Sequence, residues 1–358
     1  MPIPLILGAL AVGAGVLGVK KTIDAISDNS DANDINADAE QIYSNAKEKL
    51  QNRRTRTETA LETLGKEKLS ILDGSVTRFV KVFEQLHNVD FTDSVGLEEL
   101  KNFRLDKQSL LELKEMSAFA TSMLGGLTGG AAGGALAAFG AYSGVMALGA
   151  ASTGTAIAGL TGVAATNATL AFLGGGSLAA GGLGMAGGAA VLGGLVAGPA
   201  LAVMGFWMGA KASENLDNAR SNRAQARKIA EEMEAAGVLC DGISERSAMF
   251  KNLLLRLDEM LSPLIGHIQV FVEKKHASLT ITQKLWRFIL RHRRVEYSSL
   301  SAEQKHTVVI AASLAKAIKT VIDTPILSQE GNLTNDSERI VETITSDLDA
   351  GKYQIVNT

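Results

Sequence analysis

The chain has 358 residues and a formal net charge of −3 at pH 7, which argues against a general nucleic-acid-binding protein. Cys240 is the single cysteine, so no internal disulfide can form, although this count does not by itself choose a cellular compartment. Prolines number 5 and aromatic residues make up 5% of the chain. This composition predicts an all-α protein, in which elongated bundle or coiled-coil arms flank a Gly/Ala-rich helical hairpin region.

The N-terminal region, residues 1–21, is apolar from Ile3 to Val19 and ends in Lys20 and Lys21. Seventeen apolar residues lie at the lower limit for a membrane-spanning helix. A buried helix and a cleaved signal peptide remain alternatives, although the signal-peptide pattern is poor. Residues 22–35 are polar and without periodicity, which predicts a linker.

A first helical arm is predicted over residues 36–115. Apolar residues recur there at helical spacing and form a narrow stripe between charged residues, which is typical of a long helix in a bundle or coiled coil. Gly65 either interrupts this helix or provides a small contact within it. The polar run from His87 to Gly96 predicts a turn, and a further amphipathic helix leads from Leu97 to Met116.

The segment from Met116 to Ala210 contains no Asp, Glu, Lys, Arg or His, and it holds 25 of the 37 glycines of the chain. Its length far exceeds the ~20 residues that cross a bilayer once. We expect residues 116–210 to be a membrane-insertion region. Continuous burial inside a soluble helical shell is the alternative, because glycine and alanine are only weakly hydrophobic.

Glycines at four-residue spacing predict close helix packing within this segment. Such spacing lets helix backbones approach, and in lipid this packing drives association. The expected packing positions, with an interfacial tryptophan, are Gly125, Gly126, Gly129, Gly130, Gly133, Gly134, Gly140, Gly144, Gly184, Gly188, Gly194, Gly198 and Trp207. Basic residues flank the segment on both sides, which predicts that it enters and leaves the bilayer on one side.

Residues 211–358 are predicted to form a second helical arm with C-terminal helices. Gly237 and the run Cys240 to Gly242 are expected to end its first helix, and Pro263 is expected to bend or break the next. Ser301 and Gln304 predict a capping box for a helix that ends at Asp323, and a last helix is expected from Asn335 to Leu348. Basic residues expected at a membrane surface are Lys20, Lys21, Lys211, Arg287, Arg291, Arg293 and Arg294. For residues 285–294 a bundle helix with a basic outer face is the alternative.

Nothing in the sequence forms a catalytic constellation. The carboxylates alternate with basic residues along helix faces, and the histidines lack metal-ligand spacing. We therefore expect no enzyme activity, no catalytic residues, no cofactor and no metal.

Two stretches carry a resemblance to known families: GGLTGGAAGG at 125–134 and GGLGMAGGAAVLGGLVAGPA at 181–200, set between helical arms. The layout resembles glycine-zipper membrane-active proteins. These include helical pore-forming toxins of the cytolysin A and haemolysin BL type, apolipoprotein L-like proteins and, more broadly, bacterial glycine-zipper membrane proteins. The resemblance implies membrane insertion, with oligomerisation or permeabilisation.

The sequence thus favours a membrane-inserting helical protein that oligomerises through glycine-zipper hairpins and forms or gates a pore. A membrane-anchored scaffold or sensor, with a coiled-coil interaction surface and no pore activity, is the alternative. The expected partners are a lipid bilayer, further copies of the chain and an unidentified protein, without nucleic acid. We expect an integral or conditionally inserted membrane protein with cytoplasmic arms.

Overall fold

The computed structural model describes residues 25–89, 106–126, 132–142, 216–277, 295–328 and 331–353. These residues are almost entirely helical, and the prediction of an all-α fold is confirmed. Within the described ranges, no helix combines the length and the apolar character that crossing a bilayer requires.

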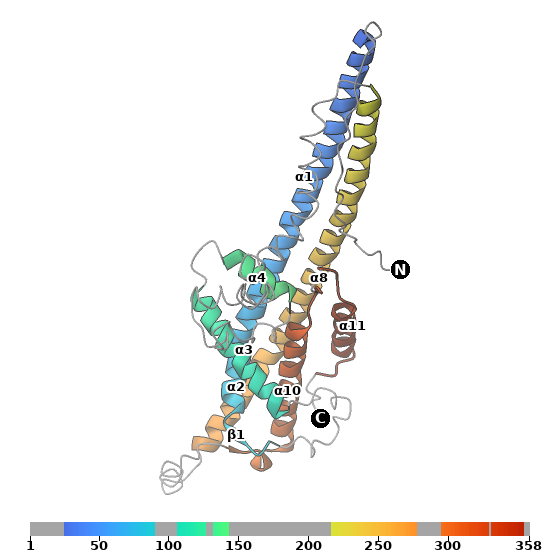
Figure 1. Cartoon of the computed structure of the whole chain (residues 1–358). Helices are drawn as coiled ribbons and strands as arrows, with labels where there is room; N and C mark the ends of the chain where they lie inside the picture. The colour runs from blue at the N-terminus through green and yellow to red at the C-terminus, as the bar shows by residue number, and fades with distance from the viewer. Residues whose placement is uncertain are drawn as a thin grey trace.

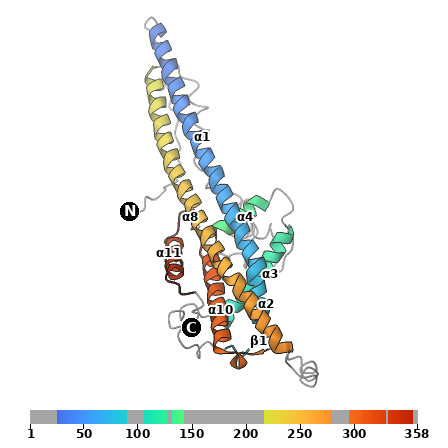
Figure 2. The same ribbon diagram turned by 180° about the vertical axis from the view of Figure 1, so that it is seen from behind.

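Two long helices run the length of the molecule side by side (Figures 1 and 2). The first is α1 (Ala25–Ile71), which passes through a π-helical turn, η1 (Leu72–Val76), into α2 (Thr77–Phe83). The second is α8 (Leu216–Ala277), whose 62 residues extend about 93 Å at 1.5 Å per residue.

The two long helices are parallel. Side-chain hydrogen bonds join Asn222 to Asn36, Thr57 to the Cys240 carbonyl, and Arg78 to Ser262, over sequence separations of 186, 183 and 184 residues. The sequence separation of the bonded residues stays nearly constant over more than forty residues of α1 and α2. This is possible only when the two long helices run in the same direction. The N-terminal ends of α1 and α8 therefore lie at the same end of the molecule.

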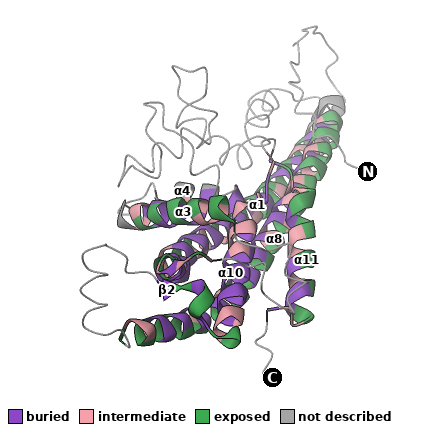
Figure 3. Cartoon of the chain, turned by 90° about the horizontal axis from the view of Figure 1, so that it is seen from below, coloured by how far each residue is buried: buried purple, intermediate pink, exposed green. Residues whose placement is uncertain are grey.

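The molecule divides into two regions along this pair. We call residues 25–57 of α1 and 216–243 of α8 the stalk, and the other described residues the bundle. The stalk is a two-helix pair with a small apolar cluster of its own, whose buried members are Tyr43, Leu50, Met233 and Cys240. The bundle contains the main core, and Figure 3 shows the buried residues on the inward faces of its helices.

The shorter elements of the bundle surround the lower ends of the two long helices. They are α3 (Lys107–Gly126), α4 (Ala132–Ala141), α10 (Ala302–Asp323), α11 (Asn335–Asp349) and the 3-10 turn η5 (Tyr297–Ser299). Two short strands, β1 (Leu86–His87) and β2 (Val295–Glu296), pair in parallel and join the end of α2 to the segment before α10.

The C-terminal predictions are confirmed. Ser301 accepts a hydrogen bond from the Gln304 backbone and the Gln304 side chain accepts one from the Ser301 backbone, so the expected capping box starts α10. This helix ends at Asp323, and α11 begins at Asn335. The α10 residues Val308, Ile310, Leu314, Ile318 and Ile322 are completely buried and belong to the main core of the bundle.

Several predicted boundaries are wrong. The expected linker 22–35 is helical from Ala25 onward, because Ala32 is buried and extends the stripe of α1. The expected break at residues 237–242 is absent, and α8 also continues through Pro263. A Cβ atom on Gly237 would meet the Arg53 side chain, so this glycine leaves room for a partner helix and does not end its own.

The helix expected to lead into the uncharged segment is α3, which has charged residues in its first half and uncharged residues in its second half. The buried side chains of Met116, Phe119 and Met123 lie in the bundle core. The first part of the uncharged segment is therefore a component of the bundle in this structure, as the alternative of burial expected.

Candidate functional site

Helix α4 belongs to the uncharged segment and lies against the bundle. It has ten residues, three of them glycine, and it packs against α1. An isolated helix of this length and composition has little stability in water. Its position therefore depends on the contacts that the bundle supplies at its crossing with α1 and at its C-terminal end.

The crossing of α1 and α4 is made by two glycines. A Cβ atom on Gly65 would clash with the Leu136 carbonyl and lie 3.1 Å from the Gly140 backbone nitrogen. A Cβ atom on Gly140 would clash with the Leu61 carbonyl and lie 3.1 Å from the Gly65 nitrogen. Because both positions lack a side chain, the two backbones touch directly. Gly65 thus provides a contact within one long helix and does not interrupt it.

Lys68 closes the C-terminal end of α4. Its Nζ donates to the carbonyl oxygens of Phe139 at 3.2 Å, Gly140 at 3.0 Å and Tyr142 at 3.3 Å. The ammonium group also lies 5.8 Å from the centre of the Phe139 ring. The last carbonyls of a helix have no intrahelical donor and carry partial negative charge. A lysine is therefore suited to bind them.

The backbone that follows α10 completes this cap. The carbonyl oxygen of Ala141 accepts from the amide nitrogens of Ile326 at 2.8 Å and Leu327 at 3.2 Å. Carbonyls of four consecutive residues, 139 to 142, thus have donors from α1 or from the segment after α10. The end of α4 is held by groups from two distant parts of the chain.

Burial of Lys68 has an electrostatic cost. The side chain is completely buried, and this burial lowers the pKa of its amine to about 7, with Asp323 acting in the opposite direction. Removing an ammonium ion from water costs several kcal/mol when no full counter-charge is beside it. The three carbonyl acceptors and the helix dipole offset part of this cost.

A second lysine connects the surrounding helices. Lys319 of α10 lies 2.7 Å from Glu112 of α3 and 2.5 Å from Asp323. Burial lowers the pKa of Lys319, but its hydrogen bonds to Asp323 and Glu112 outweigh that effect and raise it overall. Burial raises the pKa of Asp323, whose Oδ1 has no hydrogen-bond partner among the described residues. This network holds α3 and α10 together beside Lys68.

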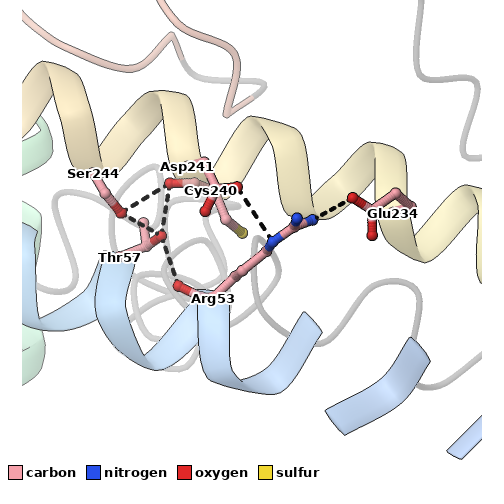
Figure 4. A network of polar contacts seen from close by, with 6 residues as sticks. All are labelled: Arg53, Thr57, Glu234, Cys240, Asp241 and Ser244. Carbon is pink, nitrogen blue, oxygen red and sulfur yellow. Dashed lines mark hydrogen bonds and ion pairs between the residues drawn. The ribbon is translucent and has the colours of Figure 1, made fainter. Parts of the chain in front are cut away.

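The stalk contains its own polar layer (Figure 4). Arg53 of α1 donates to Glu234 at 2.9 Å, and its Nε lies 3.2 Å from Asp241. Thr57 donates to the Cys240 carbonyl at 2.8 Å and shares a hydrogen bond with Ser244. A polar layer inside a helix pair fixes its register and orientation, because any shift leaves these groups without partners.

Arg54, next to this layer, is only 4% exposed. Among the described residues, its Nε and Nη2 have no hydrogen-bond partner, and burial lowers its pKa. Burying two guanidinium nitrogens without hydrogen-bond partners costs free energy, so the stalk contains an unfavourable polar group at this level.

Of the residues expected to pack or to bind a membrane, Gly140 is the one whose contacts are described. Gly125 and Gly126 lie at the end of α3, and Gly133 and Gly134 lie in α4. The following expected positions lie outside the described residues: Gly129, Gly130, Gly144, Gly184, Gly188, Gly194, Gly198, Trp207, Lys20, Lys21, Lys211, Arg287, Arg291, Arg293 and Arg294.

Lys68, Arg53 and Asp323 were not among the site residues expected from the sequence. For Lys68 a signal existed: the residue lies four positions after Leu64 and four before Leu72, on the apolar stripe of α1. A lysine at a core position indicates a specific acceptor, because an unpaired buried ammonium is costly. Its actual acceptors, the carbonyls of α4, are defined only by the tertiary structure.

No protein-family model, no curated protein and no solved structure matches this chain.

Proposed function

We propose that this chain is a membrane-inserting helical protein that oligomerises through its glycine-spaced segments and forms or gates a pore. Its membrane-facing end is the shared N-terminal end of α1 and α8. The single observation that carries this proposal is the parallel arrangement of the two long helices.

The parallel arrangement relates two apolar sequences that are far apart in the chain. Residues 3–19 end a few positions before α1 begins at Ala25, and the uncharged segment ends at Ala210, shortly before α8 begins at Leu216. Both apolar sequences therefore lead into the same end of the stalk. An antiparallel pair would have placed them at opposite ends, where one bilayer would not accept both.

The basic residues agree with this orientation. Lys20 and Lys21 lie between the first apolar sequence and α1, and Lys211 lies between the uncharged segment and α8. Lysine next to an apolar span favours the membrane surface on the cytoplasmic side. The proposal thus places three basic side chains at one interface and the arms in the cytoplasm.

Vesicle binding and leakage test the proposal together. Purified full-length protein is incubated with dye-loaded vesicles of neutral and anionic phospholipids, followed by flotation and alkaline carbonate washing. We expect the protein to float, to resist carbonate and to release dye. Protein that stays in the soluble fraction contradicts the proposal. Binding without dye release supports instead the anchored scaffold or sensor.

A glycine variant tests oligomerisation. The double change Gly129→Leu and Gly133→Leu adds bulk at four-residue spacing and is expected to abolish dye release and cross-linked oligomers. Gly266→Leu is the matched control, because no atom lies within 4 Å of a Cβ atom at this position of α8. Unchanged oligomers in the double variant contradict the role of the glycines.

A further inference from the structure

We propose that the docking of α4 on α1 is an autoinhibitory contact: it keeps residues 132–142 in the bundle and away from the membrane until α4 is released. The biological purpose of this contact rests on the proposed function, whereas the docking itself is a property of the structure. The backbone crossing, the cap on α4 and the position of α4 along α1 support the proposal.

The contacts that hold α4 form one unit. Gly65 and Gly140 let the two backbones touch, and Lys68, almost one turn after Gly65, donates to the last carbonyls of α4. The backbone after α10 donates to the carbonyl of Ala141. None of these contacts can persist once the two backbones separate. We therefore expect α4 to dock and to leave as one unit.

The ammonium group of Lys68 uses all its donors on the end of α4. It has three N–H donors, and the carbonyls of residues 139, 140 and 142 accept from it. The charge of Asp323 acts on Lys68, and Asp323 Oδ1 has no hydrogen-bond partner among the described residues. When α4 leaves, Lys68 thus has a carboxylate oxygen of the bundle to donate to. Release exchanges one set of acceptors for another and does not leave a buried ammonium unpaired.

The position of α4 keeps it out of the proposed membrane. By the register of the two long helices, Leu216 at the start of α8 lies near the level of Ala32, and the crossing at Gly65 lies about 50 Å further along α1. The hydrocarbon core of a bilayer is only ~30 Å thick. A bilayer at the shared N-terminal end therefore cannot contain the docked α4. Docking and insertion of this helix exclude each other.

The residues of α4 need no chemical change to enter lipid. The helix contains no charged side chain, and the hydrogen bonds that cap it run through its backbone carbonyls. Those carbonyls can be satisfied inside a longer helix after release, as a bilayer requires. The face of Gly140 that touches α1 then becomes available to another helix.

The substitution Gly65→Ala tests the autoinhibition from outside the uncharged segment. The added Cβ atom would clash with the Leu136 carbonyl, whereas no atom lies within 4 Å of the added Cβ atom in the matched control Gly266→Ala. Hydrogen exchange of the full-length protein in solution measures the opening constant of the amides of residues 136–142. We expect Gly65→Ala to raise this constant about 5- to 150-fold, as overpacking of a close contact does, and Gly266→Ala to leave it unchanged.

Membrane binding of the three proteins is then compared. The rate at which carbonate-resistant protein accumulates is measured on vesicles of neutral and anionic phospholipids. We expect Gly65→Ala to bind faster by a similar factor, because the fraction of protein that is competent to insert rises with the opening constant. Gly266→Ala is expected to bind at the rate of the unmodified protein.

Two further measurements make the test independent of damage to the fold. Amides of the buried helix α10 report whether each variant keeps its bundle. In the unmodified protein, the amides of Ile326 and Leu327 are expected to lose protection on vesicle binding, because their acceptor on Ala141 leaves with α4. Retained protection of these two amides in vesicle-bound protein overturns the autoinhibition without any variant.

The outcomes separate the autoinhibition from the proposed function. A raised opening constant with an unchanged rate of membrane binding overturns the autoinhibition and leaves the membrane function in place. Binding by Gly65→Ala alone supports both. Absence of binding in all three proteins contradicts the proposed function and, with it, the autoinhibition. An unchanged opening constant in Gly65→Ala disproves the close crossing and overturns the autoinhibition as well.

Discussion

The stalk and the bundle are built from the same two long helices, yet they are held together differently. In the stalk the buried positions of the pair are often alanine, as at Ala32, Ala39 and Ala219. In the bundle they are large, as at Phe79 and Phe250. Burial stabilises by roughly 25 cal/mol per Å² of apolar surface, so an alanine contributes much less than a phenylalanine.

This difference has a consequence for local stability. A region with a small apolar seam and polar layers opens at lower free energy than a region with a continuous core. We infer that the bundle determines the global stability of the protein, while the helices of the stalk separate locally. A stalk that opens at its tip suits a protein whose two apolar sequences end shortly before its helices begin.

Truncating matched core residues should give the largest contrast. Phe250→Ala removes a completely buried ring from the bundle and is expected to lower the free energy of unfolding by about 3–5 kcal/mol. Leu50→Ala, in the stalk, should lower it by less than about 1 kcal/mol, because the stalk opens before the bundle unfolds. Urea unfolding followed by circular dichroism measures both. Equal losses would show that the two regions unfold as one unit.

Adding a methyl group at the α1–α4 crossing should have an intermediate effect. Gly65→Ala forces the two backbones apart and is expected to cost about 1–3 kcal/mol, with faster exchange of the α4 amides. Gly266→Ala adds the same methyl group where nothing lies within 4 Å, and should stabilise by about 0.5–1 kcal/mol. If Gly65→Ala also stabilised the protein, the close crossing would be disproved.

Removing the stalk ion pairs should have the smallest effect. Arg53→Gln breaks the contacts with Glu234 and Asp241, and exposed ion pairs of this kind contribute little to stability. We expect faster amide exchange near Thr57, unchanged exchange in α10, and a smaller effect at high salt. The exposed neighbour Arg56 provides the control substitution, Arg56→Gln. Loss of protection throughout the bundle would contradict the division into two regions.

The sequence predicts those parts of the fold whose signals are local. The cap at Ser301, the end of α10 at Asp323 and the start of α11 are each encoded by a few adjacent residues. The helical class follows in the same way from composition and periodicity. These features require no knowledge of what packs against them.

Other features depend on contacts between distant residues. Gly237 does not end α8, because it leaves room for Arg53, and Gly242 would bring a Cβ atom within 3.1 Å of Leu333. Pro263 is tolerated inside α8 between the buried residues Leu261 and Leu264, whose packing maintains the helix. A glycine that leaves room for a partner and one that ends a helix look identical in the sequence.

The contacts of the candidate site likewise depend on residues that lie far apart in the sequence. Gly140, one of the glycines expected to pack closely, touches α1. The sequence did not reveal that the partner is Gly65, some seventy-five positions earlier, or that Lys68 caps the helix that Gly140 belongs to. Nor did it reveal the parallel direction of α1 and α8, which depends on paired layers of polar residues.

The central claim is that the shared N-terminal end of α1 and α8 faces the membrane. Two exposed alanines at opposite ends of α8, changed singly to Ala224→Cys or Ala277→Cys in a Cys240→Ser background, receive the same fluorophore. The labelled proteins are bound to vesicles that contain a quencher attached to the lipid headgroups. We predict strong quenching at position 224 and none at position 277, about 80 Å away along the helix. Equal quenching, or stronger quenching at position 277, would contradict the claim.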